Sequence, residues 1–313
     1  MARLILSRIA FAIPILFVMT FLTFFLASLI PGNAAIVILG QDATQASIDA
    51  LNASLGFDKP ILVQYIDWIS AAVRGDLGTS LYSGEQITRV LGQRFMPTFW
   101  LALLATAVSG ILGVVFGVFA AIKGGIISRI LDGVGMLGIS LPNFWIALLL
   151  IVIVSGQLKL LPAIGYTSPE DDLGDWLRHL ILPVAALGLA GIALVAKQAR
   201  DAYADALSRD FMRFMQANGI GRTSLILRHG LRYASVPIVA AISVTFINFF
   251  GATAALEQIF SIPGLGSAVA RATLNHDLSQ VQGIVLAYTV VIVIVTLITD
   301  VIYSILNPKI GTR

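Results

Sequence analysis

The sequence predicts an all-α polytopic membrane protein with six transmembrane helices, and three observations support this fold class. Hydrophobic residues make up 58% of the chain and charged residues only 12%, whereas soluble globular proteins have about 45–50% and about 25%. Six stretches without charged residues are long enough to cross a bilayer. Most of the basic residues lie in segments that these stretches place on one side of the membrane. Together these features indicate a chain built for lipid.

The charge-free windows define the predicted spans. About 20 apolar residues cross the hydrocarbon core of a bilayer, and the fourth window is only just long enough. Because unpaired peptide groups are costly in lipid, each window is expected to be a helix. An even number of spans places both termini on the same side of the membrane. The windows are residues 9–30, 95–122, 133–158, 179–196, 233–256 and 278–299.

The charge distribution predicts which side that is. Cytoplasmic loops of membrane proteins carry an excess of Lys and Arg. The side that holds both termini receives thirteen of the 20 basic residues and five of the 17 acidic ones. Both termini are therefore predicted to be cytoplasmic. The thirteen basic residues are Arg3, Arg8, Lys123, Arg129, Lys197, Arg200, Arg209, Arg213, Arg222, Arg228, Arg232, Lys309 and Arg313.

The first window follows Arg3 and Arg8, a combination that signal peptides also have. The apolar core of a signal peptide has about 7–15 residues, and this window is longer. We therefore expect residues 1–30 to be a retained first span with a short cytoplasmic N-terminus. Cleavage is the alternative.

Residues 31–94 are long enough to form a small helical domain outside the membrane. A helix is expected over residues 44–55, where Gly56 ends it. A second begins at Pro60, which suits a first helical position, and runs up to Gly75. A third helix, from about residue 84 to 95, leads into the second span. A passive connector is the alternative interpretation.

Residues 95–313 are predicted to form a five-span core. Its second and fourth spans contain small residues at helical spacing, among them Gly110, Gly113, Gly117 and Gly191. Small side chains let helix backbones approach closely inside membranes. We interpret them as packing residues in preference to a role in a pathway.

Two asparagines interrupt the apolar spans. Pro142 removes a backbone donor, so it should kink or break the third span, and Asn143 follows it. Asn248 lies in the fifth span. Polar groups at membrane depth pair with a neighbouring helix or face a cavity. Interhelical hydrogen bonds and a translocation pathway are equally compatible with this pattern. No charged residue lies in mid-span, which argues against an ion relay.

The most basic stretch of the chain is residues 206–237, between the fourth and fifth spans. Its pattern predicts a short helix, a break at Gly219 and a second short helix. Each half has an apolar side, so the stretch is expected to lie at the membrane face and to present a ridge to the cytosol. The stretch contains five arginines and a single acidic residue, Asp210.

The segment after the fifth span lies on the predicted external side. Glu257 and Phe260 precede a Pro-Gly turn formed by Pro263 and Gly264. These residues are candidates for an external gate that closes the outer mouth of a pathway. A re-entrant turn that caps the fifth span is the alternative, and the residue pattern slightly favours it.

Several kinds of chemistry are missing from the sequence. No G-x-x-x-x-G-K-[ST] word occurs, so the chain has no P-loop of its own. The histidines His179, His229 and His276 are scattered and form no metal-ligand spacing. With no cysteine, disulfides and thiolate sites are excluded. A catalytic, cofactor or metal site is therefore not expected, and the topology rule accounts for most of the basic charge without nucleic acid.

The words in residues 206–237 carry a family resemblance. The run from Asp210 to Ile220, the Leu-Arg-His-Gly-Leu-Arg word at residues 227–232 and Pro237 resemble the cytoplasmic EAA-type loop of ABC importer permeases. They are most similar to the B-type subunit of the di- and oligopeptide (peptide/nickel) permease family. Words at residues 29–32, 55–60, 63–65, 74–80 and 257–266 and the tail near Asn307 extend the resemblance over nearly the whole chain.

In that family the loop contains a coupling helix that docks on an ATPase subunit. The positions that the resemblance assigns to this role are Asp210, Phe211, Arg213, Gln216, Ala217, Gly219, Arg222 and Arg228. This sequence departs from the family pattern at two places. Asn218 stands where Lys is usual, and Arg213, Phe214 and Met215 stand where the wider motif has Glu-Ala-Ala. The energetics of docking are therefore expected to differ in detail.

The resemblance implies a permease subunit in the cytoplasmic (inner) membrane that moves di- or oligopeptides by alternating access. The implied partners are a homologous second permease, one or two kinds of ATPase subunit that bind ATP and Mg²⁺, and an external substrate-binding protein that the domain of residues 31–94 helps to receive. Nickel or another small solute is the alternative cargo. A stand-alone secondary transporter is the alternative from another class, and a membrane enzyme is a remote one.

Overall fold

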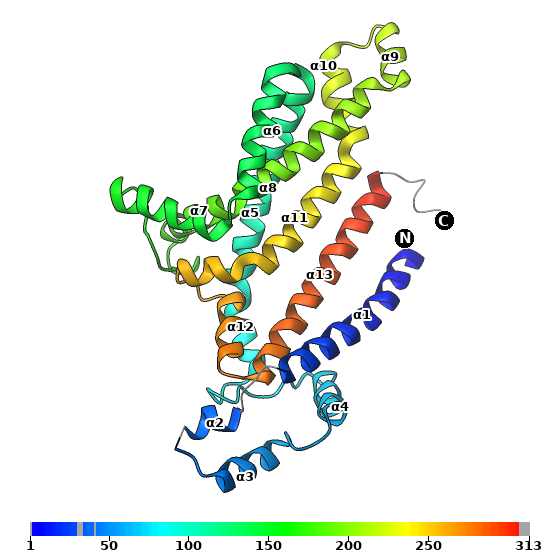
Figure 1. Cartoon of the computed structure of the whole chain (residues 1–313). Coiled ribbons are helices and arrows are strands. Elements are labelled where there is room, and N and C mark those ends of the chain that lie inside the picture. The colour runs from blue at the N-terminus through cyan, green and yellow to red at the C-terminus, as the bar shows by residue number, and fades with distance from the viewer. Residues whose placement is uncertain (1, 30–33, 41, 307–313) are drawn as a thin grey trace. The chain divides into compact units, whose positions relative to one another are not determined.

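The computed structural model describes residues 2–29, 34–40 and 42–306, which form helices joined by turns. Figure 1 follows the chain from α1 (Ala2–Ser28) to α13 (Leu278–Leu306). In the described ranges, extended backbone is paired only at an isolated bridge between Thr79 and Gln86. The all-α class predicted from the sequence is confirmed.

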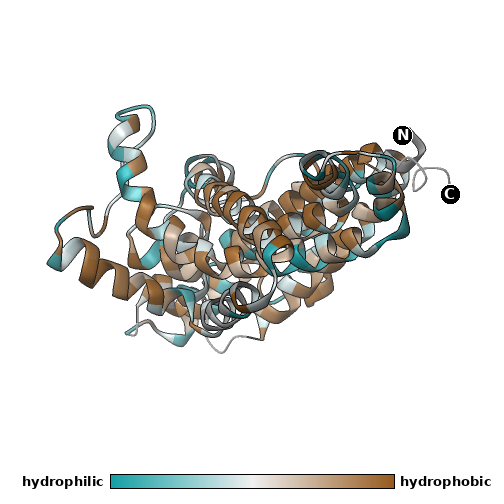
Figure 2. Cartoon of the chain, turned by 90° about the horizontal axis from the view of Figure 1, so that it is seen from above, coloured by the Kyte–Doolittle hydropathy of each residue, from teal (hydrophilic) through white to brown (hydrophobic). Residues whose placement is uncertain are grey.

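Five helices in these ranges are long and apolar enough to cross a membrane. They contain the first, second, fourth, fifth and sixth predicted windows almost completely, and several extend well beyond them. Figure 2 shows hydrophobic residues, in brown, along much of the helical part of the chain. The five are Leu6–Ser28, Ile87–Lys123, Leu173–Ser208, Arg222–Ile259 and Leu278–Leu306.

The third predicted window is not one continuous helix. Helix α6 (Gly125–Ser140) ends before Pro142, and α7 (Asn143–Leu150) begins after it and continues as a π-helical segment, η1 (Ile151–Gln157). Pro142 has extended backbone with φ −62° and ψ 134°. Because proline cannot donate a backbone hydrogen bond, the interruption falls where the sequence predicts it. The apolar helix after the break is only Asn143–Gln157.

Contacts divide the chain into two compact units. Unit 1 contains Phe99–Ile262 together with the parts of the chain before Leu6 and after Val293. Unit 2 contains Leu6–Thr98 and Pro263–Val293. The division predicted from the sequence, after residues 30 and 94, follows membrane topology and stays a prediction.

Helix α8 (Leu173–Ser208) is the centre of unit 1 and packs against α6, α7 and α11 (Leu231–Ile259). The part of α5 (Ile87–Lys123) in this unit lies very close to it. A Cβ atom added at Gly113 would lie 2.7 Å from the Cβ of Val195, and one at Gly117 would lie 2.4 Å from the carbonyl oxygen of Ala196. The small residues therefore serve helix packing, as predicted.

The small helices α3 (Gln45–Leu55) and α4 (Ile61–Ala72) of unit 2 lie close to their predicted places. Thr44 caps α3, and Gly56 ends it with φ +74°, a backbone conformation that favours glycine. Pro60 immediately precedes α4 instead of being its first residue, and α4 ends before Gly75. Helix α5 begins at Ile87, which agrees with a helix that leads into the second span.

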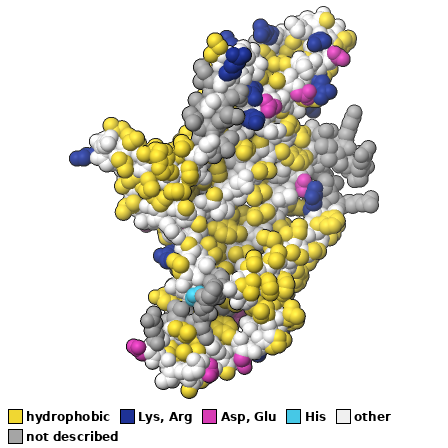
Figure 3. Space-filling view, in the orientation of Figure 1, with side chains coloured by type: hydrophobic (Ala, Val, Ile, Leu, Met, Phe, Trp, Pro, Cys, Tyr) yellow, Lys and Arg dark blue, Asp and Glu magenta, His cyan; other side chains and the backbone are white. Residues whose placement is uncertain are grey.

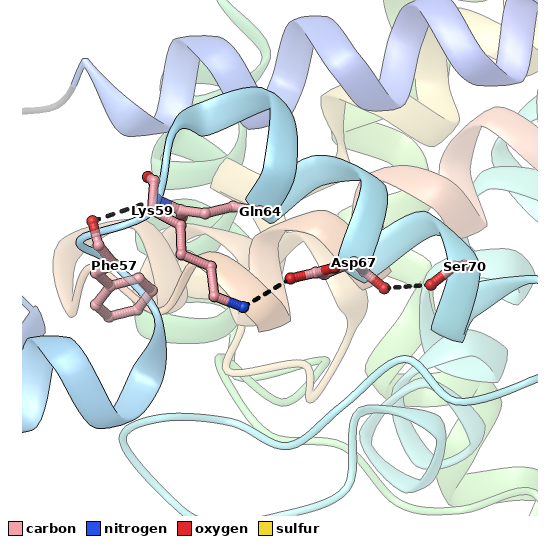
Figure 4. A network of polar contacts seen from close by, with 5 residues as sticks. All are labelled: Phe57, Lys59, Gln64, Asp67 and Ser70. Carbon is pink, nitrogen blue, oxygen red and sulfur yellow. Dashed lines mark hydrogen bonds and ion pairs between the residues drawn. The ribbon is translucent and has the colours of Figure 1, made fainter.

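The turn between α3 and α4 is held by a polar network (Figure 4). The Gln64 side-chain amide donates to the carbonyl oxygens of Phe57 at 3.3 Å and Lys59 at 2.8 Å. Lys59 Nζ lies 2.9 Å from Asp67 Oδ2, and this hydrogen bond raises the pKa of the lysine above its usual value. Since both charged groups are exposed, the ion pair orients the turn and adds little stability.

Buried polar contacts join α1, α4 and α13 within unit 2. The hydroxyls of Thr20 and Tyr65 lie 2.9 Å apart, and the Gln282 side chain donates to the Thr20 carbonyl at 2.7 Å. The buried Asp277 accepts hydrogen bonds from the Ser80 hydroxyl and from the Leu81 backbone. These bonds connect residues far apart in the sequence. The helical cap is therefore tied to the spans of its own unit by specific contacts.

We expect Gly117→Ala to lower the stability of the protein by about 1–3 kcal/mol, the usual cost of overpacking a core. The added methyl group would collide with the backbone of α8, which cannot move aside easily. The measurement is the thermal unfolding temperature of the purified protein in detergent. Gly251→Ala is the matched control, because a Cβ at Gly251 meets no atom within 4 Å. Equal unfolding temperatures for the two variants would contradict the packing interpretation.

Candidate functional site

The basic stretch of residues 206–237, called the elbow below, forms a projecting helical hairpin at one end of α8 and α11 (Figure 1). After α8 ends at Ser208, Arg209 has extended backbone and occupies the position before the short helix α9 (Asp210–Ala217). Gly219 then turns the chain with φ +82°. The Ile220 amide donates to the Met215 carbonyl at 3.2 Å and closes the turn. The helix–glycine break predicted from the sequence is present.

The second half of the elbow differs from the prediction. A separate second short helix is not formed: α10 (Arg222–Ser224) and the π-helical turn η2 (Leu225–Gly230) lead directly into α11. The described helix is therefore continuous from Arg222 to Ile259. The apolar residues Leu225 and Ile226 of this segment pack inward against unit 1, so the segment is held as the first turns of the longer helix.

Helix α9 has one packed side and one exposed side. Met212 is buried, at 4% exposure, and Phe211 and Met215 are half-buried. Arg213, Gln216 and Ala217 are exposed, and Phe214 is 71% exposed. Aromatic residues and arginine are both enriched in protein interfaces. The exposed ridge of α9 is therefore suited to contact another protein.

The base of α9 is joined to α8 and α11 by polar and aromatic contacts. Asp205 accepts hydrogen bonds from Arg209 at 3.0 Å and from the Tyr233 hydroxyl at 3.1 Å. The Arg209 guanidinium lies 5.8 Å from the centre of the Tyr233 ring, and the Phe211 ring lies 5.6 Å from the same ring. These contacts are largely exposed, so each contributes modestly. Together they fix the direction in which α9 leaves α8.

The structure places the residues predicted for this surface on three short helical segments and the turn that follows the first of them. Asp210, Phe211, Arg213, Gln216 and Ala217 lie on α9, Gly219 forms the turn, Arg222 begins α10 and Arg228 lies in η2. Basic side chains gather around this end of unit 1 in Figure 3.

Asp210 and Arg213 are only weakly paired, at 3.9 Å between charged atoms, and both are exposed. The guanidinium of Arg213 is therefore accessible to a partner.

Sequence patterns do not identify Tyr203, Asp205 and Tyr233 as functional residues. They lie outside the family-like words of residues 206–237, but their side chains contact the elbow. Their contacts join residues from different helices. The spacing of apolar residues within one helix therefore does not predict them. The nearest signal in the sequence is Gly230, because its missing side chain leaves room for the Tyr203 ring.

Asn143 and Asn248 line the same cavity in unit 1. It has a volume of about 330 Å³ and lies among α7, α8 and α11. The Thr245 hydroxyl, also at its wall, donates to the Ala241 carbonyl at 2.7 Å. The remaining wall is apolar. The residues that line it are Leu141, Pro142, Asn143, Ala190, Gly191, Leu194, Thr245, Asn248, Phe249 and Ala252.

A mostly apolar cavity with two side-chain amides can bind a small molecule that offers both apolar surface and amide groups. Each amide can donate and accept hydrogen bonds at the same time. The break at Pro142 places Asn143 at the first turn of α7, where its side chain reaches the cavity.

The candidate gate residues belong to the end of α11 and the start of α12 (Leu265–Leu274). Glu257 and Phe260 are buried in unit 1. The Ile262 amide donates to the Glu257 carbonyl, and Ser261 has φ +56°, so this segment ends α11 in a tight turn.

In unit 2, Pro263 is exposed and Gly264 precedes α12. The contacts account for a helix-ending turn, and the gate role stays a prediction.

Known proteins match almost the whole chain. Residues 113–312 match the family model "Binding-protein-dependent transport system inner membrane component", and residues 1–102 match the model of its N-terminal region. A probable peptide ABC transporter permease of Sinorhizobium fredii is 34% identical over 98% of both chains. The glutathione transport system permease GsiC of Escherichia coli and a putative peptide transport system permease of Brucella abortus are each 33% identical over 99% of both chains.

Among solved structures, a chain of the MetNI methionine ABC transporter in inward-facing conformations matches with a TM-score of 0.58 and 14% identity. The match covers 70% of the present chain and 97% of the other. At this identity the match supports a shared fold.

Proposed function

The chain belongs to the family of inner membrane components of binding-protein-dependent transport systems and is a permease subunit of an ABC importer, and we propose that its cargo is di- and oligopeptides. The observation that carries this proposal is the match over almost the full length to permeases named for peptide or glutathione transport. The cavity that contains two side-chain amides supports it, because peptides present amide groups whatever their side chains.

ABC importers work with ATPase subunits, a substrate-binding protein and a second permease. For this chain we propose a homologous second permease, one or two kinds of ATPase subunit and an external peptide-binding protein that contacts the cap of residues 31–94. ATP and Mg²⁺ are bound by the partners, and the present chain carries no cofactor and does not itself hydrolyse ATP. The assembly lies in the cytoplasmic (inner) membrane, with both termini of this chain in the cytoplasm.

In the proposed mechanism the elbow is the lever that receives force. Closure of the ATPase subunits on ATP moves α9, and the helices alternate between inward-open and outward-open states. The exposed Phe214 and Arg213 supply an apolar and a charged contact to the ATPase surface. Arg222 and Arg228 extend this contact, since both are exposed on the same end of unit 1.

The proposed pathway includes the cavity between α7, α8 and α11. Asn143 and Asn248 bind the peptide backbone by hydrogen bonds, and the apolar wall accepts side chains of different shapes. This division explains how a permease can carry peptides of many sequences. Glu257, Phe260, Pro263 and Gly264 are proposed to form the outer gate of this pathway.

Cargo identity is tested by isolating the native complex through a tag on this chain. We expect a second permease, an ATPase and an external binding protein to co-purify, and we expect di- or tripeptides to raise the unfolding temperature of that binding protein. The matched comparison is Ni²⁺ added to the same protein. Stabilisation by Ni²⁺ alone would point to the nickel-type alternative, and ATP-independent uptake by this chain alone would point to a secondary transporter.

Coupling is tested with two changes in the elbow. Gly219→Pro cannot adopt φ +82° and removes the amide that donates to the Gln216 carbonyl. Arg213→Glu reverses the exposed charge of α9. We expect each to lower peptide uptake per ATP hydrolysed by about tenfold or more. Gly219→Pro acts by disrupting the turn after α9, and Arg213→Glu acts through charge, since like charges facing each other across an interface cost several kcal/mol. Membrane insertion should be unchanged.

The control for charge is Arg178→Glu, the same reversal at an exposed position on the predicted external side. It should leave uptake per ATP unchanged. Normal pumping by complexes with both elbow changes would show that the coupling assignment is wrong.

The pathway is tested with single cysteines, because the natural chain contains none. We expect Asn143→Cys and Asn248→Cys to react with a water-soluble maleimide at rates that change during peptide transport. The cavity is the route by which reagent and peptide reach them. Ala147→Cys, at a fully buried position on α7, is the control and should not react. If transport alters neither cysteine's reactivity, the two asparagines are packing residues only.

A further inference from the structure

A π-helical turn connects the elbow to α11. In η2 (Leu225–Gly230) the Leu231 amide donates to the Ile226 carbonyl, five residues before it, instead of the fourth residue before it as in an α-helix. Such turns are rare within helices and often occur at functional positions. In this chain the turn lies where the elbow continues into a predicted membrane span. The C-terminal end of α9 is therefore connected to α11 through this turn.

Tyr203 of α8 binds the same carbonyl. Its hydroxyl donates to the Ile226 oxygen, so that oxygen accepts both the backbone amide of the π turn and the phenol. The Tyr203 side chain is fully buried in a cluster with Ala199, Ala234 and Ile238. A buried hydroxyl that pairs with a backbone carbonyl is a specific contact, because loss of either partner leaves a polar atom without water.

Gly230 makes room for this contact. A Cβ atom at Gly230 would lie 3.0 Å from both Cζ and Oη of Tyr203, the atoms that carry the hydrogen bond. Any side chain at this position would require the phenol to shift by a few tenths of an ångström. The glycine at the end of η2 and the tyrosine on α8 therefore fit each other, although they are far apart in the sequence.

The other contacts around the elbow are of a different kind. The Tyr233 hydroxyl donates to Asp205, but both residues are exposed and can exchange this bond for water. Such exposed contacts orient α9, but each contributes little free energy and breaks easily when α9 moves. The Tyr203–Ile226 bond is made by a side chain that is buried among the packed helices of unit 1, so its hydroxyl is less accessible to water than that of Tyr233.

From this geometry we propose that Tyr203, seated against Gly230, is a positioning residue for energy coupling. Its hydroxyl fixes η2 to α8, so that α8, the elbow and the start of α11 move together when α9 is displaced. Without the bond, the π turn absorbs part of the displacement and less of it reaches the cavity side of α11. This inference rests on the proposed role of the elbow as the lever of an ATP-driven importer.

The test uses the complete importer in proteoliposomes, with a defined mixture of radiolabelled di- and tripeptides as probe. Tyr203→Phe removes only the hydroxyl. We expect the amount of assembled complex to be unchanged and the ATP hydrolysed per peptide to rise about fivefold, the factor that corresponds to one hydrogen bond of about 1 kcal/mol. Gly230→Ala should raise the ratio in the same direction, because it displaces the phenol without deleting it.

Tyr303→Phe is the matched control, as it deletes a phenol on α13, outside the elbow, and should leave the ratio unchanged. An unchanged ratio in Tyr203→Phe, or equal rises in the two tyrosine variants, would overturn the proposal. Loss of assembled complex in Tyr203→Phe would also overturn it, since the residue would then serve stability alone.

Arg213→Glu, assayed in parallel, separates this inference from the proposed function. If Arg213→Glu uncouples the importer and Tyr203→Phe does not, only the role of Tyr203 is wrong. If Arg213→Glu leaves coupling intact, the elbow itself is not the lever.

Discussion

A backbone in lipid has no water to pair with, and this constraint decides where the chain can depart from regular helix. Two departures in the described chain are local and supported by protein contacts. At the Pro142 break, α7 restarts at once, with the Trp145 amide donating to the Pro142 carbonyl at 3.0 Å. At η2, the displaced hydrogen-bond pattern is completed by the phenol of Tyr203. At Pro142 and at η2, irregular backbone thus coincides with a proposed function.

Close packing between helices supplies the scaffold for these irregular places. With no hydrophobic driving force between helices in lipid, association depends on contact at short range. Gly191 illustrates this: a Cβ there would lie 2.5 Å from Phe249 and from the Ser109 hydroxyl. The same glycine also lines the cavity that contains Asn143 and Asn248. Removing side chains from one face of α8 therefore both brings the helices together and leaves space beside them.

Unit 1 carries two surfaces of different chemistry. The elbow presents an exposed phenylalanine and several arginines, which suit a protein partner. The cavity presents amides among apolar walls, which suits a peptide. Helices α8 and α11 contribute to both, because each runs from the cavity to the elbow. A subunit without a nucleotide site needs such a connection, since the energy for transport must enter at one end and act at the other.

The sequence by itself determined the helical fold, the stop at Pro142, the turn at Gly219 and the basic character of the elbow. Each of these depends on local chemistry: apolar length, a missing amide, a missing side chain or the count of charges in a loop. Only the tertiary structure decided that Asn143 and Asn248 share one cavity, that the elbow's second half is continuous with α11, and that Tyr203 reaches Ile226. These facts depend on which helix faces meet, and a single helix has no pattern that records the face of its neighbour.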